Sequence, residues 1–186
     1  PGIDGRNVLT AKALHTKAKA LLRFTGPTLL RRLHALPVAR DVMIGKRVVI
    51  MGGRLHGCQT AEYLVNLGRQ VTIVDTGTQE QIGEGLLDVF MKPYLLFWLQ
   101  DRGVEFVTDV EYQEVTSEGL VVREKDGATR LLVADTVMTA LPLVPDRATV
   151  AAMAGAAPQV VVIGDAAEPH LIVDAIAAGA KVGREI

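Results

Sequence analysis

The chain has 186 residues, enough for one large domain or for one domain and part of another, and its formal net charge is −1 at pH 7. Hydrophobic residues make up 49% of the chain, but no apolar run is long enough to cross a bilayer, and no signal peptide is recognisable. The single cysteine, Cys58, excludes an internal disulfide and a C-x-x-C pair. These features favour a cytoplasmic protein without a membrane anchor.

The first 44 residues carry most of the basic excess. The patterns predict two short helices, from Thr10 to about Phe24 and from Pro27 to about Leu36. A basic arm can bind nucleic acid, but this one has only Phe24 between its charges and no recognised reading motif. We therefore expect solvated helix faces and no nucleic-acid partner.

A βαβ unit is predicted between residues 45 and 75. Arg47–Met51 is a short apolar run typical of a strand buried on both faces. A glycine-rich turn follows, apolar residues then recur at helical spacing from Leu55, and Gly68 ends the helix. Gln70–Val74 is a second apolar strand, which ends on Asp75. This order predicts half of a Rossmann-like dinucleotide-binding fold.

The residue types of this unit suit a dinucleotide. Gly52, Gly53 and Gly57 let the backbone turn tightly and bring free N–H groups at a helix start close to a pyrophosphate. A carboxylate at Asp75 accepts hydrogen bonds from ribose hydroxyls and repels a 2′-phosphate, which favours NAD(H) over NADP(H).

One position of the G-x-G-x-x-G fingerprint departs from the pattern, because Arg54 replaces the middle glycine. The arginine has two conceivable effects: it clamps phosphate, or it holds the pyrophosphate away from the backbone. We expect the second. A rival interpretation is a non-catalytic Rossmann-like domain whose nucleotide site is occluded and which serves docking or structural support.

After Asp75 the pattern predicts a polar loop over Thr76–Gly85 and a helix from about Leu86 to Asp101, kinked or broken at Pro93. Alternating residues and an Asp126-Gly127 turn then predict a β-meander. The remaining predicted elements before residue 155 are the strands Val104–Val107, Val110–Val115, Gly119–Glu124, Thr129–Val133 and Asp135–Leu141 and a helix around Ala148–Met153.

The last unit begins with an all-apolar strand, Val160–Ile163, followed by Gly164-Asp165 and a helix from about Leu171. This order places a carboxylate and free N–H groups at the carboxyl edge of a sheet, where ligands bind in open α/β folds. Taken alone, Asp165 is more simply explained as a helix cap or a turn residue.

With both motifs in view, the chain resembles the flavoproteins with two dinucleotide-binding domains. Within them it is most similar to the C-terminal part of the 2,4-dienoyl-CoA reductase and trimethylamine dehydrogenase group of NAD(P)H:flavin oxidoreductases, which are of the pyridine nucleotide-disulfide oxidoreductase type. The segments that carry the resemblance are Pro1–Ala11, Val48–Leu64, Val71–Asp75 and Val160–Ile186.

The resemblance implies an α/β chain with three parts. Residues 1–44 would leave a flavin domain, residues 45–146 would form a Rossmann-like NAD(P)-binding domain with a β-meander, and residues 147–186 would return to the flavin domain. Gly52, Gly53, Arg54, Gly57 and Asp75 would line the nicotinamide nucleotide, whereas Gly164 and Asp165 would face FAD.

The resemblance also implies the partners. The chain opens on Pro-Gly without an initiator Met, and we expect a segment of a longer flavoprotein whose other parts complete the FAD site. FMN and an iron–sulfur cluster would belong to that parent and not to this segment. No catalytic residue and no metal site is predicted here, the sequence is compatible with a homo-oligomer, and the segment alone is not expected to turn over.

Overall fold

The computed structural model describes residues 1–10, 44–86, 89–141, 143–145 and 147–185. By its internal contacts the chain divides into two compact units, Pro1–Leu141 and Pro142–Ile186. The two basic helices predicted before residue 37 lie outside the described residues.

Five parallel strands form the main sheet of the first unit, in the order β1-β8-β2-β3-β4. Their bounds are Val8–Thr10 (β1), Arg47–Met51 (β2), Gln70–Val74 (β3), Glu105–Val107 (β4) and Thr136–Thr139 (β8). The chain leaves β2 for β3 and β4 on one side, and β8 then adds on the other side of β2. The strand order therefore reverses next to β2, and this is where open α/β sheets bind ligands.

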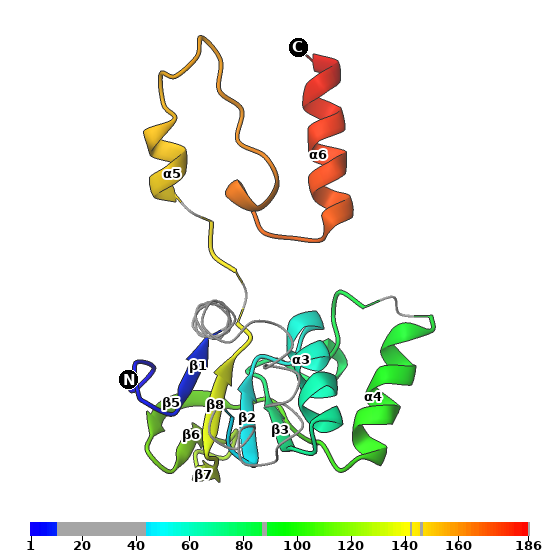
Figure 1. Cartoon of the computed structure of the whole chain (residues 1–186), viewed down its shortest axis with the longest axis vertical. Helices are drawn as coiled ribbons and strands as arrows, with labels where there is room; N and C mark the ends of the chain where they lie inside the picture. Colours follow the sequence, from blue (N-terminus) through cyan, green and yellow to red (C-terminus); the bar gives the residue numbers. More distant parts are fainter. Residues whose placement is uncertain (11–43, 87–88, 142, 146, 186) are drawn as a thin grey trace, which may run out of the picture. The chain divides into compact units, whose positions relative to one another are not determined.

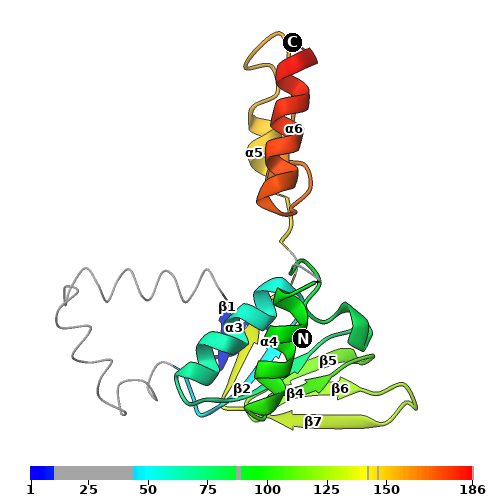
Figure 2. The same cartoon turned by 90° about the vertical axis from the view of Figure 1, so that its right-hand side faces the viewer.

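Two helices, α3 (Leu55–Asn66) and α4 (Met91–Asp101), lie side by side along the sheet (Figures 1 and 2). An antiparallel meander of β5 (Glu111–Thr116), β6 (Gly119–Arg123) and β7 (Thr129–Val133) forms a second sheet.

The β2 side chains alternate between these two layers. Val48 and Ile50 pack in one core with the helices, whereas Val49 and Met51 pack in another core with the meander. Because β2 is buried on both faces, its sequence is an almost unbroken apolar run. The parallel sheet with its helices and the antiparallel meander confirm the predicted α/β fold.

Two predicted elements differ from the structure. The helix α4 begins at Met91 and not at Leu86, so Pro93 lies in its first turn, where the missing N–H costs no intrahelical hydrogen bond and causes no break. The predicted strand Val160–Ile163 is wrong: the segment joins no sheet among the described residues, and its four side chains are exposed. A strand requires a partner strand, which this part of the chain does not supply.

The second unit contains α5 (Arg147–Ala152), a 3₁₀ turn η2 (Gly164–Ala166) and α6 (Ile172–Glu185). None of its described residues is buried, although α6 has a marked apolar side and Ile172, Val173 and Ile176 are largely exposed. An apolar surface of this kind is normally covered in a complete domain.

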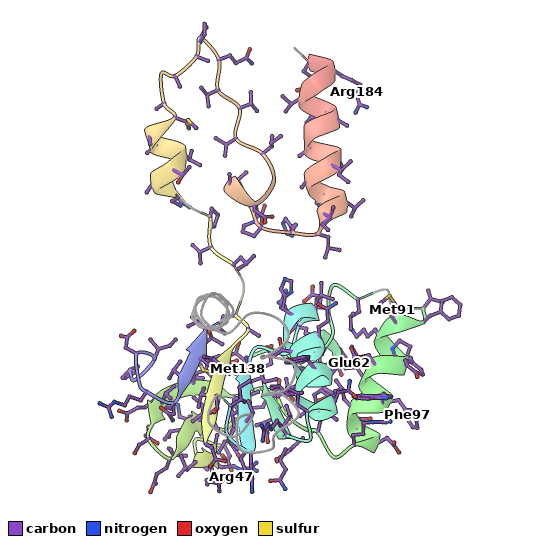
Figure 3. All side chains as sticks on the ribbon, viewed as in Figure 1. Arg47, Glu62, Met91, Phe97, Met138 and Arg184 are labelled. Atoms are coloured by element: carbon purple, nitrogen blue, oxygen red, sulfur yellow. The ribbon has the colours of Figure 1, made fainter. Side chains whose placement is uncertain are left out.

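An ion pair anchors the end of the sheet opposite the glycine-rich turn, where β2 begins at Arg47 (Figure 3). Asp135 accepts a hydrogen bond from the Arg47 backbone N–H at 2.9 Å as well as pairing with its guanidinium. The bonds to Arg47 lower the pKa of Asp135 from 3.8 to about 2.

The Asp135 pair predicts an acid-dependent contribution to stability. Since the pKa is lowered in the folded state, the contribution is present above the unfolded value of 3.8 and is lost as the pH falls towards 2. We expect Asp135→Asn to lower the free energy of unfolding by about 1 kcal/mol at pH 7, because the pair is partly exposed. Urea unfolding at pH 7 and at pH 2 measures this, and an equal difference at both values would contradict the assignment.

Candidate nucleotide site

The turn from β2 into α3 requires glycine at two positions. Gly52 has a φ of +102°, and a Cβ there would lie 2.6 Å from the carbonyl oxygen of Ala140, just after β8. A Cβ at Gly57 would overlap the carbonyl oxygen of Gly52, so the helix packs directly on the turn. The predicted glycine-rich turn is thus a close backbone junction at the switch point of the sheet.

The start of α3 offers backbone donors. The N–H groups of His56 and Gly57, in the first helical turn, donate to no group in the described part of the chain, whereas the Leu55 N–H donates to the carbonyl of Glu84 at 2.9 Å. The preceding residue, Arg54, has an extended conformation and makes no side-chain cap. Free N–H groups at the positive end of a helix dipole attract an anion.

The Arg54 side chain is held beside this turn by an ion pair. Its Nη1 atom lies 2.8 Å from Oε2 of Glu84, and both side chains are about half exposed, at 51% and 53%. The guanidinium is therefore not buried in the crevice between the strands. Glu84 is thus held at the start of α3 by its carboxylate, through Arg54, and by its carbonyl, through the Leu55 N–H.

A short loop, Ile82–Glu84, lies against the glycine-rich turn. The Gly83 N–H donates to the carbonyl of Gly53 at 2.8 Å, and Ile82 is fully buried, with its Cδ1 atom where a Gly53 side chain would lie. Sequence reasoning missed these residues. Ile82 was detectable, because it is the one large apolar residue in the polar loop Thr76–Gly85.

Asp75 lies at the end of β3, as predicted, and both of its carboxylate oxygens accept backbone hydrogen bonds. Oδ2 accepts from the Gly53 N–H at 2.6 Å, and Oδ1 accepts from the Gly77 N–H at 2.7 Å. These bonds fix the orientation of the carboxylate. Since each oxygen has a second lone pair, Asp75 retains acceptor capacity for hydroxyl groups.

Two further polar groups near the turn are structural. The Cys58 thiol is fully buried, donates to the carbonyl of Gly53 at 3.1 Å, and has its pKa raised by burial to about 11. It stays protonated at neutral pH and serves as a small buried side chain. Tyr112 donates its hydroxyl to the carbonyl of Val74 at 2.9 Å, and burial raises its pKa as well.

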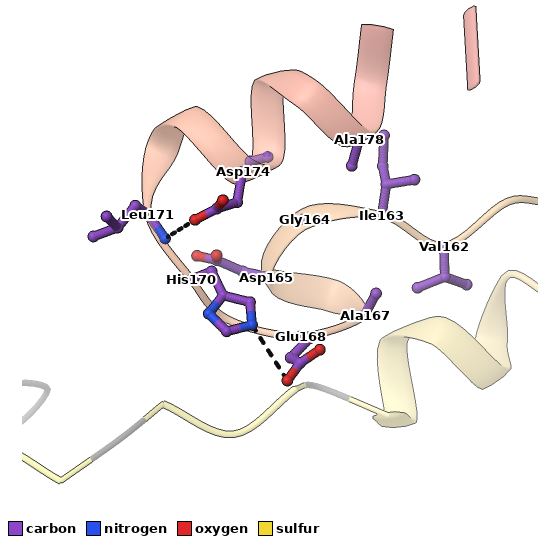
Figure 4. A pocket seen from close by; sticks show the side chains of 11 residues that line it. Val162, Ile163, Gly164, Asp165, Ala167, Glu168, His170, Leu171, Asp174 and Ala178 are labelled. Atoms are coloured by element: carbon purple, nitrogen blue, oxygen red, sulfur yellow. Dashed lines mark hydrogen bonds and ion pairs between the residues drawn. The ribbon is translucent and has the colours of Figure 1, made fainter. Parts of the chain in front are cut away.

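Gly164 and Asp165 lie in the second unit, around a small pocket of about 180 Å³ at the start of α6 (Figure 4). Gly164 has a φ of +58°, and the carboxylate of Asp165 accepts no hydrogen bond from the described residues. Asp174 instead accepts the Leu171 N–H at 3.1 Å at the start of α6. Asp165 therefore does not cap α6; it lies in the 3₁₀ turn η2, in agreement with the alternative explanation as a turn residue.

The structure brings Gly52, Gly53, Arg54, Gly57 and Asp75 together at one edge of the main sheet, whereas Gly164 and Asp165 belong to the other unit. Among the described residues no group of three His, Cys, Asp or Glu side chains is placed to hold a metal ion. No helix in the same residues is long and apolar enough to cross a membrane.

Known proteins of similar sequence and structure indicate a family for this chain. A family model described as pyridine nucleotide-disulphide oxidoreductase matches residues 1–179. A probable ferredoxin reductase of Castellaniella defragrans is 32% identical over 120 residues, which are 62% of this chain and 29% of that protein. An NADH oxidase of Thermoanaerobacter brockii is 30% identical over 160 residues, covering 80% of this chain and 24% of that protein.

The fold is also shared with a solved structure. A 2-naphthoyl-CoA reductase matches all of this chain and 24% of its own length, at a TM-score of 0.69 and 24% identity. The chain therefore spans 24–29% of the length of these proteins.

Proposed function

Because this chain belongs to the pyridine nucleotide-disulphide oxidoreductase family, we propose that its unit Pro1–Leu141 binds NAD(H) and positions the nicotinamide for hydride transfer to a flavin. The observation that carries the proposal is the junction of Gly52 and Gly57 at the switch point, with Asp75 fixed beside it. In such a protein the cofactors supply the redox chemistry, and the chain supplies binding and orientation.

The residues at the turn fit the nucleotide in chemical type. The N–H groups of His56 and Gly57 suit a pyrophosphate, because they are free donors at a helix start. The Asp75 carboxylate suits the adenosine ribose, because it is oriented by two N–H groups and retains acceptor capacity. Glycine at Gly52 and Gly57 allows the backbone to approach both groups.

The flavin is proposed to belong to the longer protein. Gly164, Asp165 and the start of α6 offer one wall of a site and no glycine-rich pyrophosphate loop, so the described residues fit FAD only in part. The exposed apolar segment Val160–Ile163 supports a role for residues 147–186 as the return of the chain into a flavin domain, where another strand would pair with it.

A second candidate function is supported by one observation. The backbone carbonyl of Glu84 accepts a hydrogen bond from the Leu55 N–H, and the Glu84 side chain forms an ion pair with Arg54. If this loop stays in place, the unit is a docking or structural domain with an occluded site. The two candidates differ in whether added nucleotide reaches the turn.

The proposal predicts tighter binding of NADH than of NADPH. A 2′-phosphate beside the half-buried Asp75 is a contact between like charges, so we expect NADH to bind at least about tenfold more tightly. Titration of the 186-residue chain, followed by nucleotide fluorescence, measures both affinities. Binding of neither nucleotide favours the docking function, and tighter NADPH binding rejects the role given to Asp75.

A further inference from the structure

Asp109 has an unusual backbone conformation. It follows β4 at the carboxyl edge of the main sheet, and its φ of 60° makes it the one non-glycine residue with a positive φ in the described part of the chain. Such a conformation is strained for most side chains, while Asp and Asn tolerate it better than others. Residues held in this way tend to serve a site.

Hydrogen bonds link Asp109 to the proposed ribose corner, which is formed by Asp75 and Gly77. Its backbone N–H donates to the carbonyl of Gly77 at 2.8 Å. The Gly77 N–H in turn donates to Asp75 at 2.7 Å, and Asp75 accepts the Gly53 N–H. A continuous series of hydrogen bonds therefore runs from the end of β4 to the glycine-rich turn.

The Asp109 side chain forms an ion pair with a lysine of the meander. Its Oδ1 atom lies 2.8 Å from Nζ of Lys125, which belongs to the β6–β7 hairpin, and the Asp109 side chain is only 25% exposed. This pairing lowers the pKa of the Asp109 carboxyl, so it is ionised at neutral pH. A cleft of about 340 Å³, lined by Thr108, Asp109 and Lys125 among others, lies at the same place.

Two other cations of the described residues lie near this corner, and neither of them is held by Asp109. Lys92 donates to the backbone carbonyl of Glu80 at 2.7 Å, and Arg130, which also lines the cleft, pairs with Glu105 at 2.9 Å. A backbone carbonyl leaves the charge of Lys92 uncompensated. Lys125 is therefore the lysine here whose charge a carboxylate, that of Asp109, neutralises before a 2′-phosphate can use it.

We infer that Asp109 is a specificity-determining residue for the dinucleotide: it positions Gly77 and Asp75 for an unphosphorylated ribose and withholds Lys125 from a 2′-phosphate. The inference rests on the proposed function, since it concerns how the same site discriminates between NADH and NADPH. It extends the discrimination from Asp75 to a residue just after the neighbouring strand β4 and to a lysine of the meander.

The test uses Asp109→Asn in the 186-residue chain. Asparagine tolerates the left-handed conformation and keeps the backbone N–H, but it removes the charge that holds Lys125. NADPH should bind about tenfold more tightly than to the unmodified chain, while NADH affinity changes by less than about twofold. Asp109→Gly, which also accepts a positive φ, should give the same shift and serves if the asparagine variant folds poorly.

Two controls complete the experiment. Asp109→Asn combined with Lys125→Gln should lose the gain for NADPH, and Asp126→Asn, in the same hairpin, should leave both affinities unchanged. If NADH binds but the ratio of affinities is unmoved, or moves equally without Lys125, the inference is overturned and the proposed function stands. If neither nucleotide binds to any variant, both are overturned.

Discussion

Arg54→Gly is expected to bind NADH at least about tenfold more tightly than the unmodified chain. The middle glycine of the fingerprint allows a pyrophosphate to approach the backbone, and at Arg54 a Cβ intrudes there. Each hydrogen bond to a charged group that is restored contributes about 1.5–3 kcal/mol, or roughly tenfold to more than a hundredfold in affinity. The substitution also frees the half-exposed Glu84 side chain, which is then no longer held beside the turn. Calorimetry on both proteins measures the change.

Arg54→Ala separates the two parts of this effect. Alanine keeps the Cβ but removes the guanidinium and its pair with Glu84. If the Cβ is the obstruction, Arg54→Ala binds NADH as weakly as the unmodified chain. If the obstruction is Glu84, held in place by Arg54, Arg54→Ala recovers most of the gain in NADH affinity that Arg54→Gly gives. Equal or weaker NADH binding by Arg54→Gly would show that the arginine is a phosphate ligand.

Asp75→Ala is expected to weaken NADH binding by about ten- to a hundredfold, the loss of one or two charge-assisted hydrogen bonds to ribose hydroxyls. NADPH should lose much less, because the repulsion of its 2′-phosphate disappears with the carboxylate. The variant also leaves the Gly53 and Gly77 N–H groups without their acceptor, so the free energy of unfolding should fall by about 1–3 kcal/mol.

Fluorescence titration with both nucleotides and urea unfolding measure these effects. Asp101→Ala is a matched control, because that carboxylate is exposed at the end of α4 and its one ion pair within the described ranges is with Arg102. NADH binding that Asp75→Ala leaves intact would remove Asp75 from the site.

The βαβ unit was predictable because its signals are local. Arg47–Met51 and Gln70–Val74 are apolar runs whose bounds agree with the structure, and Gly68 ends α3 with a φ of +75°. The same local signals gave a wrong prediction where the structure depends on a pairing strand outside the segment. Val160–Ile163 has the composition of a buried strand, but it pairs with no strand among the described residues.

The glycines and Asp75 were also predictable, since the fingerprint fixes their spacing. The loop Ile82–Glu84 was not, because its position depends on two contacts between residues distant in sequence: Ile82 on Gly53, and Glu84 with Arg54. Asp109 was equally hidden. A positive φ on a non-glycine residue has no sequence signature, and the ion pair with Lys125 arises only when the meander folds back on β4.

The most direct test of the nucleotide site is a titration of the ¹⁵N-labelled chain with NADH, followed by amide chemical shifts. The proposed site predicts that the largest changes fall on the free donors His56 and Gly57 and on Gly53 and Gly77, whose N–H groups hold Asp75. Leu55 should shift as well if the Glu84 loop is displaced. Unchanged amides at the glycine-rich turn with NADH in excess, or changes confined to other parts of the chain, would contradict it.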